Sequence, residues 1–500
     1  MKLAPVQHIL GISGGFHDAA ATVLNTQGDI VYAAHAERYS KLKNAADLHE
    51  DMFWELAESR SIDHIAYYER PWLKQLRRLR SGEGVDWSQL TLAQVLRRQL
   101  GGFFSEVPRS CYSHHLSHVA AGFQTSPFDR ATVVVIDAIG ELDTISIYAA
   151  EYNQQGRAEY RRLWSQQYPH SIGLFYSAIT ARVGLHPMDE EYITMGMSAW
   201  GDSRFSQELV RSHVVDSVED LRFRENLHIG LDPDSFNGIS DEDIAAGAQR
   251  VVEELIYSVM QRARAFGWST NLVYQGGVAL NCLANRNLSD YFENVWIMPC
   301  PGDAGSSLGA AALRYGGPIN WRNAYLGTEI LGEYPVDACV RSLLHDRICG
   351  VASGRAEFGP RALGNRSLLA DPRGPDIKDL VNRIKRRQQY RPFAPVVLEE
   401  HATDLFDMPG GYVDTSYMQV IGRCRHPDLY PAIVHVDGTS RVQTVKQDGS
   451  GIRRLLEAWY EATGCPMLLN TSLNIRGEPM VNDRADADRF EKLYGVRVHS

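Results

Sequence analysis

The alternation of hydrophobic and polar residues predicts two similar groups of short strands in the first part of the chain. The first group consists of three apolar runs separated by turns containing glycine and asparagine, a pattern typical of a β-meander: residues 9–13, 19–24 and 30–34. Residues 131–136 and 144–149 repeat the pattern around a turn that contains Gly140. The intervening stretches 46–100 and 116–123 favour helix.

Two strand groups with helices between them suggest a duplicated α/β domain that grips a nucleotide between its halves. This is the architecture of actin-like and sugar-kinase-like phosphotransferases. Farther along, residues 241–266 predict a long helix, and residues 271–274 and 295–298 predict strands. The pattern breaks around residues 325–327, and a chain of 500 residues is too long for one ordinary core. We therefore expect two domains, residues 1–326 and 327–500.

Composition indicates a globular enzyme. Hydrophobic residues make up 44% of the chain and charged residues 22%, enough for a large core and a polar surface. The seven cysteines are scattered without a Cys-x-x-Cys pair, which argues against a disulfide framework and fits a reducing cytoplasm. The N-terminal apolar segment, residues 8–12, is too short for a signal peptide or a membrane span. We expect a cytoplasmic protein without membrane contact.

The charge balance argues against a general nucleic-acid binder. The formal net charge is −10, whereas a nucleic-acid-binding surface is basic. One segment, residues 70–80, nevertheless combines several arginines and Lys74 with Trp72. A solvated basic helix face is its ordinary interpretation, and a local nucleic-acid contact is the alternative.

Two histidines form the first candidate metal site. If residues 116–123 are helical, His114 and His118 lie one turn apart and present two imidazoles on one face. His115 projects away from them and is interpreted as a supporting residue. The strand that follows ends in Asp137, a hard oxygen ligand at a strand end. The alternative is a group of surface histidines that cap a helix.

Three glycine-containing turns are candidates for binding a nucleotide. The first holds Gly14, with His17 and Asp18 behind it, and His17 could serve as a base. The other two turns each follow a strand and precede a helix, so that amide donors are available for an anion. They contain Gly276, Gly277 and Asn281, and Gly302 and Asp303. Asp303 is either a helix N-cap or a fourth metal ligand. For the Gly276 turn, a purely structural tight turn is the alternative.

The last third of the chain is rich in arginines on short loops beside glycine and proline. Such stiffly held guanidinium groups suit a small doubly charged anion, which they bind by bidentate hydrogen bonds. Ion pairs with the chain's own carboxylates are the alternative for some of them. The residues concerned are Arg355, Arg361, Arg366, Lys385, Arg387, Arg391, Arg441 and Arg476, with Asn474 beside the last.

At these motifs the sequence resembles the O-carbamoyltransferase family of NodU, CmcH and TobZ. The matching pieces run in order from residue 9 to residue 481. They are Gly11-Ile12-Ser13 with His17-Asp18, His114-x-x-x-His118, Asp137, Gly276-Gly277-Val278-Ala279-Leu280-Asn281, Gly302-Asp303-Ala304-Gly305, the segment 357–367, the segment 435–445 and the segment 469–479. The sequence departs from the family pattern at Thr194 and Gln388, and its tail after Val481 is shorter.

The resemblance implies an actin-like and sugar-kinase-like (ASKHA) duplicated domain followed by a smaller YrdC-like α/β domain. It implies that His114, His118, Asp137 and Asp303 hold a divalent metal, Fe²⁺ or alternatively Mg²⁺, next to ATP. It assigns Arg361, Lys385, Arg391, Arg441, Asn474 and Arg476 to carbamoyl phosphate, and His17 to activation of the acceptor hydroxyl, with Asp18 beside it. The glycine turns, through Gly14, Gly276, Gly277, Asn281 and Gly302, are expected at ATP.

The expected activity is ATP-dependent transfer of a carbamoyl group from carbamoyl phosphate, through carbamoyl-adenylate, to a hydroxyl. The acceptor is left open among natural-product sugars, oligosaccharides and hydroxymethylated pyrimidines, free or in DNA. Two other functions compete: a tRNA threonylcarbamoyl-type modification enzyme, and a non-catalytic actin-like nucleotide-binding regulator. Small-molecule substrates are the expected partners, and a homodimer is compatible with this expectation.

Overall fold

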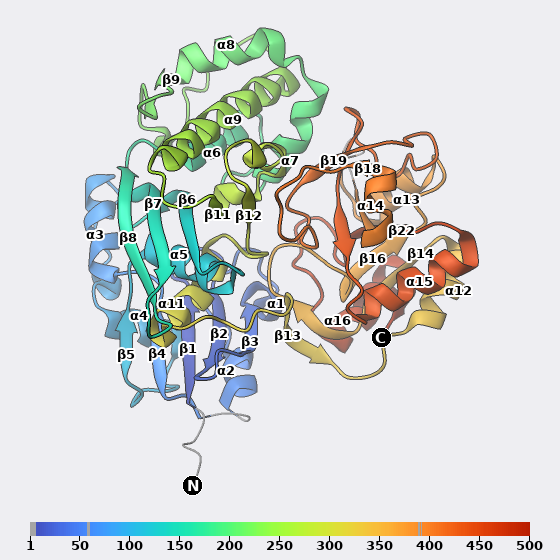
Figure 1. Ribbon diagram of the computed structural model, residues 1–500, viewed down its shortest axis with the longest axis horizontal. Coiled ribbons are helices and arrows are strands. Elements are labelled where there is room, and N and C mark those ends of the chain that lie inside the picture. The colour runs from blue at the N-terminus through green and yellow to red at the C-terminus, as the bar shows by residue number, and fades with distance from the viewer. Residues whose placement is uncertain (1–6, 58–60, 389–390, 392) are drawn as a thin grey trace.

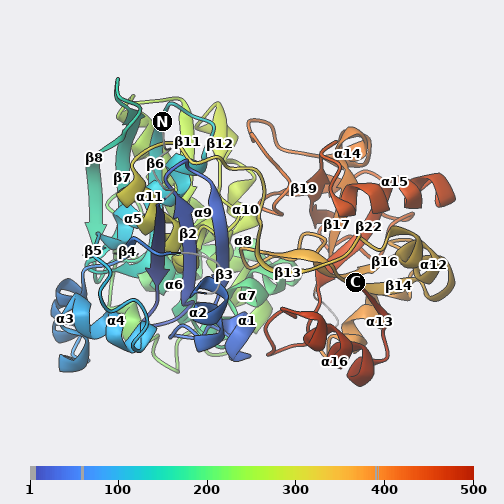
Figure 2. The same ribbon diagram turned by 90° about the horizontal axis from the view of Figure 1, so that it is seen from below.

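The computed structural model describes residues 7–57, 61–388, 391 and 393–500. The chain forms two bodies that lie side by side, one built from the blue to yellow part of the chain and one from the orange to red part (Figure 1). Strand β13 (Tyr325–Ile330) runs between them (Figure 2). It pairs with β15 (Gly354–Glu357) of the second body and packs against β3 of the first, so this ribbon joins the two.

The first body contains two five-stranded sheets of the same topology. One has the order β3-β2-β1-β4-β5 and the other the order β8-β7-β6-β11-β12. In each, the first three strands form an antiparallel meander, and the fourth and fifth run parallel to the first. The strands of the first sheet are β1 (His8–Ser13), β2 (Ala20–Asn25), β3 (Ile30–His35), β4 (His64–Tyr67) and β5 (Arg109–Cys111). Those of the second are β6 (Arg130–Gly140), β7 (Asp143–Tyr152), β8 (Ala158–Gln167), β11 (Asn271–Gln275) and β12 (Asn294–Trp296).

Two buried helices fill the space between these sheets. Helix α11 (Ser306–Tyr315) covers the first sheet, α5 (His114–Thr125) covers the second, and the two helices pack against each other. Their close approach requires Gly309, because a Cβ there would meet the Ser117 carbonyl oxygen at 1.8 Å. Helices α6 (Ile172–Arg182) and α9 (Asp241–Ala265) pack on the second sheet from its other side (Figure 1).

The second body is built on a mixed six-stranded sheet of order β21-β17-β22-β16-β14-β23. Its strands are β14 (Ile348–Ala352), β16 (Arg366–Ala370), β17 (Ala394–Leu398), β21 (Gln443–Val445), β22 (Met467–Ser472) and β23 (Val498–His499). The flanking helices are α12 (Val336–Asp346), α13 (Ile377–Ile384), α14 (Glu399–Leu405), α15 (Gly451–Thr463) and α16 (Arg484–Tyr494), and a small sheet joins β18 (Phe406–Asp407), β19 (Ile421–Cys424) and β20 (Thr439–Arg441). The predicted fold class, a duplicated actin-like domain followed by an α/β domain, is confirmed.

Three sequence-based element predictions were wrong or incomplete. The stretch 46–100, which includes residues 58–60 outside the described part, holds α2 (Glu50–Ala57), α3 (Pro71–Arg80) and α4 (Leu92–Leu100), but also strand β4. Strand β8 was missed because it is an edge strand with polar, half-exposed side chains that lack an apolar alternation. The turn at Gly276 leads only into a 3₁₀ turn, η4 (Gly277–Leu280), and the one-turn α10 (Cys282–Asn285). Among the described residues, no helix combines the length and apolarity needed to cross a bilayer.

Candidate active site

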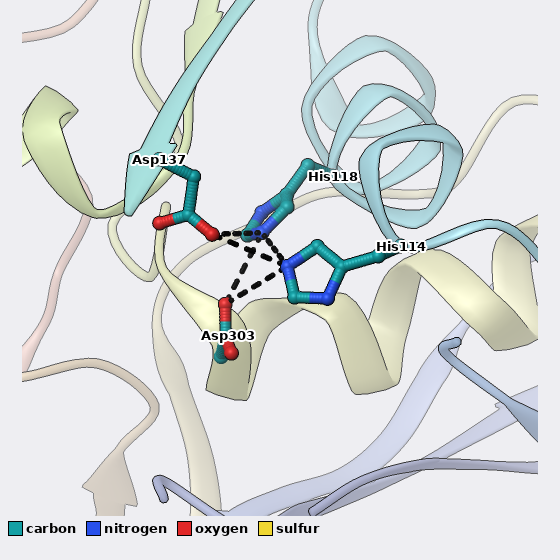
Figure 3. Close-up of side chains that lie close together, drawn as sticks. All are labelled: His114, His118, Asp137 and Asp303. Atoms are coloured by element: carbon teal, nitrogen blue, oxygen red, sulfur yellow. Dashed lines mark hydrogen bonds and ion pairs between the residues drawn. The ribbon is translucent and has the colours of Figure 1, made fainter. Parts of the chain in front are cut away.

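Four buried side chains from distant parts of the chain converge between the two sheets. His114 and His118 come from the first turns of α5, Asp137 from the end of β6 and Asp303 from η6 (Asp303–Gly305), directly before α11 (Figure 3). The His114 Nε2 atom lies 3.1 Å from His118 Nε2, 3.2 Å from an Asp137 oxygen and 3.3 Å from an Asp303 oxygen. All four donor atoms lie within 4.8 Å of one another.

These separations fit a shared cation. Metal–ligand bonds of about 2.1 Å, at angles between about 90° and 110°, hold ligand atoms roughly 3.0–3.4 Å apart. The electrostatics agree, because Asp137 and Asp303 bring two carboxylates together in a buried space. Burial opposes their charge, but the neighbouring imidazoles prevail and lower the pKa of Asp137 to about 2 and that of Asp303 well below its usual range. The same carboxylates outweigh the burial of His114 and raise its pKa. The donor set therefore fits a divalent metal with mixed nitrogen and oxygen ligands.

Residues around this four-residue cluster hold the ligands in place. The carboxylate of buried Glu69 lies 3.7 Å from His114 Nδ1 and is itself paired with Lys74 at 2.7 Å. His115, as expected, points elsewhere: its Nδ1 lies 2.6 Å from the Ser146 hydroxyl. Burial lowers the pKa of His115 to about 3, so it is a neutral support. Sequence reasoning missed Glu69, because a lone glutamate after a strand carries no distinguishing pattern.

His17 stands on the turn after β1, at the edge of the cluster. Its Nδ1 lies 2.9 Å from an Asp18 oxygen and its Nε2 lies 4.0 Å from an Asp303 oxygen. Asp18 adopts a left-handed backbone conformation, with φ of 51°, which turns its carboxylate back toward the ring. Burial acts to lower the pKa of His17, but the hydrogen bond to Asp18 and the charge of Asp303 raise it to about 9. One imidazole nitrogen is thereby oriented by a carboxylate while the other faces the cluster.

The five residues expected at a nucleotide divide into two groups. Gly277, Asn281 and Gly302 line the cavity described below, whereas Gly14 and Gly276 lie behind its wall. Gly14 accepts a hydrogen bond from the Tyr67 hydroxyl, and a Cβ at Gly276 would meet the Ile136 carbonyl oxygen at 2.2 Å. These two glycines thus permit close packing.

Polar groups of Gly277 and Asn281, which line the cavity, already have hydrogen-bond partners within the protein. The Gly277 N–H donates to Asp137, which fixes that ligand from behind. Asn281 exchanges two hydrogen bonds of 3.1 Å with Gln249 of α9, a cavity residue that the helical pattern gave no means of singling out.

The second body brings together the six residues expected at carbamoyl phosphate. Arg361, Lys385, Arg391, Arg441, Asn474 and Arg476 all line one cavity, with Arg387 as a further member. The Lys385 ammonium donates to the Ser472 carbonyl at 2.5 Å and to Asn474 Oδ1 at 2.9 Å, so it shapes the loop after β22. Arg476 pairs with Glu190 at 3.0 Å. Arg361, Arg391 and Arg441 form no ion pair with a carboxylate in the described part of the chain.

The positive charge of this arginine pocket is largely uncompensated. Burial, and then the charge of Arg441, lower the pKa of Arg361 to about 9. Burial and neighbouring arginines likewise lower the pKa of Lys385 and of Arg387 well below the usual range. The buried Nε of Arg441 has no hydrogen-bond partner among the residues described. Such a group of mutually repelling cations is complementary to a small dianion.

Other arginines of the same region have structural roles instead. Arg366 is fully buried and donates to backbone carbonyls of Asn482, Ser353 and Thr328, at 3.0, 3.1 and 2.9 Å. Arg355 donates to the carbonyl of Leu326 in the joining ribbon and to that of Val31 in β3 of the first body. Backbone carbonyls, rather than carboxylates, accept the hydrogen bonds of the Arg366 guanidinium.

One cavity of about 1080 Å³ connects both groups of residues. We call His114, His118, Asp137 and Asp303 the metal-type cluster. Of its members, His114, Asp137 and Asp303 line the cavity, and His17 lines it as well. The arginine pocket opens into the same space from the second body. Both groups of residues therefore face one continuous space.

The basic segment 70–80 is helix α3, and much of its charge is paired. Arg70 binds Glu141 at 2.7 Å, Lys74 binds Glu69 and Arg77 binds Glu83. Lys74 and Arg77 are buried, so the expectation of a solvated basic face was wrong for them. Ion pairs with glutamates of the same chain neutralise the charge of these side chains.

Comparison with known proteins identifies the family of the chain. The family model described as carbamoyltransferase N-terminus matches residues 94–312, and the one described as carbamoyltransferase C-terminus matches residues 340–497. Among solved structures, the activator of 2-hydroxyisocaproyl-CoA dehydratase from Clostridium difficile covers 62% of this chain and 94% of its own, with 14% identity and a TM-score of 0.34.

Curated relatives cover most of the chain. The uncharacterized protein sll1178 of Synechocystis is 32% identical over 96% of this chain and 94% of its own. The nodulation protein NolNO of Sinorhizobium fredii is 30% identical over 96% of this chain and 79% of its own. The 3'-hydroxymethylcephem-O-carbamoyltransferase of Amycolatopsis lactamdurans is 30% identical over 79% of this chain and 80% of its own. The chain thus belongs to the carbamoyltransferase family and is a transferase enzyme.

Proposed function

We propose that this enzyme is an ATP-dependent O-carbamoyltransferase that works in three steps within one cavity. Residues 327–500 receive carbamoyl phosphate, and residues 1–326 form carbamoyl-adenylate and transfer its carbamoyl group to a hydroxyl. The observation that carries the proposal is that the cluster of two histidines and two aspartates and the arginine pocket line the same cavity.

The first step takes place among the arginines. Water cleaves carbamoyl phosphate to carbamate and inorganic phosphate, with release of one proton. Arg361, Arg391 and Arg441, which lack carboxylate partners in the described residues, supply hydrogen bonds to the phosphoryl oxygens as negative charge shifts onto the departing phosphate. Lys385 and Asn474 hold the loop that frames the phosphate.

The second step joins carbamate to the nucleotide. A carbamate oxygen attacks the α-phosphorus of ATP, the bond to the β-phosphate oxygen breaks, and carbamoyl-adenylate and pyrophosphate form. Gly277, Asn281 and Gly302 line the part of the cavity next to the cluster and are our candidates for contact with the nucleotide. His114, His118, Asp137 and Asp303 would hold a divalent cation, Fe²⁺ or Mg²⁺, which supplies positive charge beside the phosphates.

The third step transfers the carbamoyl group. His17 takes the proton of the acceptor hydroxyl as its oxygen attacks the carbamoyl carbon, and AMP leaves. Asp18 orients the ring through its 2.9 Å contact with Nδ1, which leaves Nε2 toward the cavity. The negative charge of Asp303 contributes to the raised pKa of His17. A cation bound by the ligand set would share that charge.

The rim beside His17 favours an uncharged hydroxylated acceptor. The Phe16 ring is 50% exposed and lies 5.0 Å from the His17 ring, and Ile229, also lining the cavity, is 82% exposed. The cations at this rim, Lys74 and Arg77, are paired with glutamates. An acceptor here meets apolar surface and compensated charge, which suits a small neutral molecule better than a nucleic acid.

The test is incubation with carbamoyl phosphate, ATP, Fe²⁺ or Mg²⁺, and a panel of neutral sugars, hydroxymethyl compounds, hydroxymethylated DNA and tRNA. The expected result is AMP and pyrophosphate formation that depends on carbamoyl phosphate, with a mass gain of one carbamoyl group on a small acceptor. Carbamoylation of tRNA would favour the threonylcarbamoyl-type alternative. ATP binding without AMP or pyrophosphate would favour a nucleotide-binding regulator.

A further inference from the structure

A four-residue segment at the start of α7 (Glu191–Met197) contacts both halves of the first body and the second body. We call residues 189–192 the junction segment. Glu191 ties it to α6, because its carboxylate accepts hydrogen bonds from the Ser177 hydroxyl and the Met188 N–H, both at 2.6 Å. The segment is therefore fixed to the second sheet's half of the first body, and its other side chains are free to reach outward.

Two acidic side chains of the junction segment bind opposite sides of the cavity. Asp189 pairs at 2.5 Å with Lys43, which follows the meander of the first sheet. Glu190, 5% exposed, pairs at 3.0 Å with Arg476 of the arginine pocket and also accepts the His186 N–H. The segment thus lies where the two halves of the first body meet the second body.

Tyr192 lines the cavity at this meeting point, between cations of both bodies. The Lys43 ammonium lies 5.6 Å from the centre of its ring, and the Arg391 guanidinium lies 4.9 Å from it. Both distances are within the range of a cation–π contact. Arg391 is one of the arginines that we assign to carbamoyl phosphate, so the ring touches the wall of the compartment in which carbamate would form.

We propose that Tyr192 is a retention residue, whose ring closes the side of the passage between the arginine pocket and the metal-type cluster. The inference rests on the proposed function, in which carbamate travels that passage. Carbamate loses CO₂ readily in water, so any route out of the cavity turns carbamoyl phosphate into phosphate without product. A planar ring held by one cation from each body would block such a route.

The coupling between the first two steps tests this role. In the intact enzyme each phosphate released is matched by one AMP once the carbamoyl group has been transferred. Tyr192→Ala should leave phosphate release within about threefold of the wild type and raise the ratio of phosphate to AMP at least about fivefold, because carbamate escapes. Tyr192→Phe keeps the ring and should keep the ratio near one. Tyr460→Ala, at an exposed tyrosine on α15 outside the cavity lining, is the matched control and should not change the ratio.

The outcomes separate this inference from the function on which it rests. A wild-type enzyme that forms no carbamoyl phosphate-dependent AMP would overturn both. A coupled wild type with a Tyr192→Ala variant of unchanged ratio would overturn retention alone. Loss of phosphate release in that variant would also overturn it, because Tyr192 would then serve binding or folding. A rise in the ratio for Tyr192→Phe or Tyr460→Ala would equally contradict a role of the ring at this place.

Discussion

Replacement of Arg361 by glutamine should make the empty protein more stable and its complex with phosphate much weaker. The reason is the uncompensated charge of the arginine pocket. Arg361 makes no ion pair with a described carboxylate, and burial together with Arg441 lowers its pKa from 12.5 to about 9. Such a side chain destabilises the empty protein, because it repels its neighbours. It stabilises the complex, because it hydrogen-bonds the ligand.

The size of both effects can be worked out. The pKa change of Arg361 corresponds to about 4–5 kcal/mol against the charged form. Solvent within the cavity reaches this half-buried side chain and screens most of that, which leaves about 1–2 kcal/mol. For a domain of about 150–250 residues, that should raise Tm by roughly 2–8 °C. Loss of one bidentate, charge-assisted contact should cost about 2–4 kcal/mol of phosphate binding, or about 30- to 1000-fold in Kd.

Arg366, the first residue of the following strand β16, provides the control. It donates six hydrogen bonds to backbone carbonyls, and Arg366→Gln would leave several of those buried acceptors without a donor. Each unsatisfied carbonyl costs about 1–3 kcal/mol, so the free energy of unfolding should fall by several kcal/mol. Two arginines five positions apart should therefore shift Tm in opposite directions.

Thermal unfolding with and without inorganic phosphate, together with calorimetric titration of carbamoyl phosphate, measures both effects. Wild-type protein at a phosphate concentration of about 100 times its Kd should gain about 2.7 kcal/mol, and Arg361→Gln should gain less than about 1 kcal/mol at that concentration. If Arg361→Gln lowered Tm in the absence of phosphate, or kept the phosphate-induced gain, the assignment of this residue to an anion would be wrong.

Three further predictions concern the rest of the site. His118→Ala should weaken binding of divalent metal at least about 10- to 100-fold, measured by titration of metal-free protein, whereas His115→Asn should retain it, because His115 lies outside the ligand set. Phosphate affinity should fall as pH rises above about 9, since Arg361 binds a dianion only while protonated; a flat calorimetric profile from pH 8 to 10 would contradict this. His17→Ala should slow carbamoyl transfer about 10²–10⁴-fold but leave formation of pyrophosphate from ATP, and nearly full transfer would exclude a general base at this position.

The strands and helices that carry the site could be predicted from the sequence because each has a clear periodicity. The apolar runs at β1, β2 and β6 are continuous, and α5 combines an alanine-rich core face with two histidines one turn apart. The convergence of Asp303 with those histidines could not be derived from spacing, since it depends on how α11 packs against α5. The local sequence around Asp303 is equally compatible with a helix N-cap.

The roles of individual arginines were even less predictable. Arg361 and Arg366 stand in one glycine-rich motif, and both looked suited to an anion. Only the fold shows that the backbone carbonyls around Arg366 satisfy that side chain, while Arg361 faces an open cavity with other cations. Hydrogen-bond partners on distant loops, such as Asn482 for Arg366, leave no trace in local sequence. Edge strand β8 was missed for a related reason, because a half-exposed strand has no need of apolar alternation.

The cavity holds opposite charges at its two ends, and the fold keeps them from neutralising each other. Asp137 and Asp303 are fixed by a strand end and a helix start in the first body, while Arg361 and Arg391 stand on loops of the second body and Arg441 ends its strand β20. The ion pairs Glu190–Arg476 and Lys41–Asp486 span the two bodies, and neither of them uses Asp137 or Asp303. A cation at one end would therefore meet aspartates whose partners are the neighbouring histidines, and a dianion at the other end would meet arginines without a carboxylate partner in the described residues. It follows that metal and phosphate should stabilise the protein independently, and that their effects on the free energy of unfolding should add.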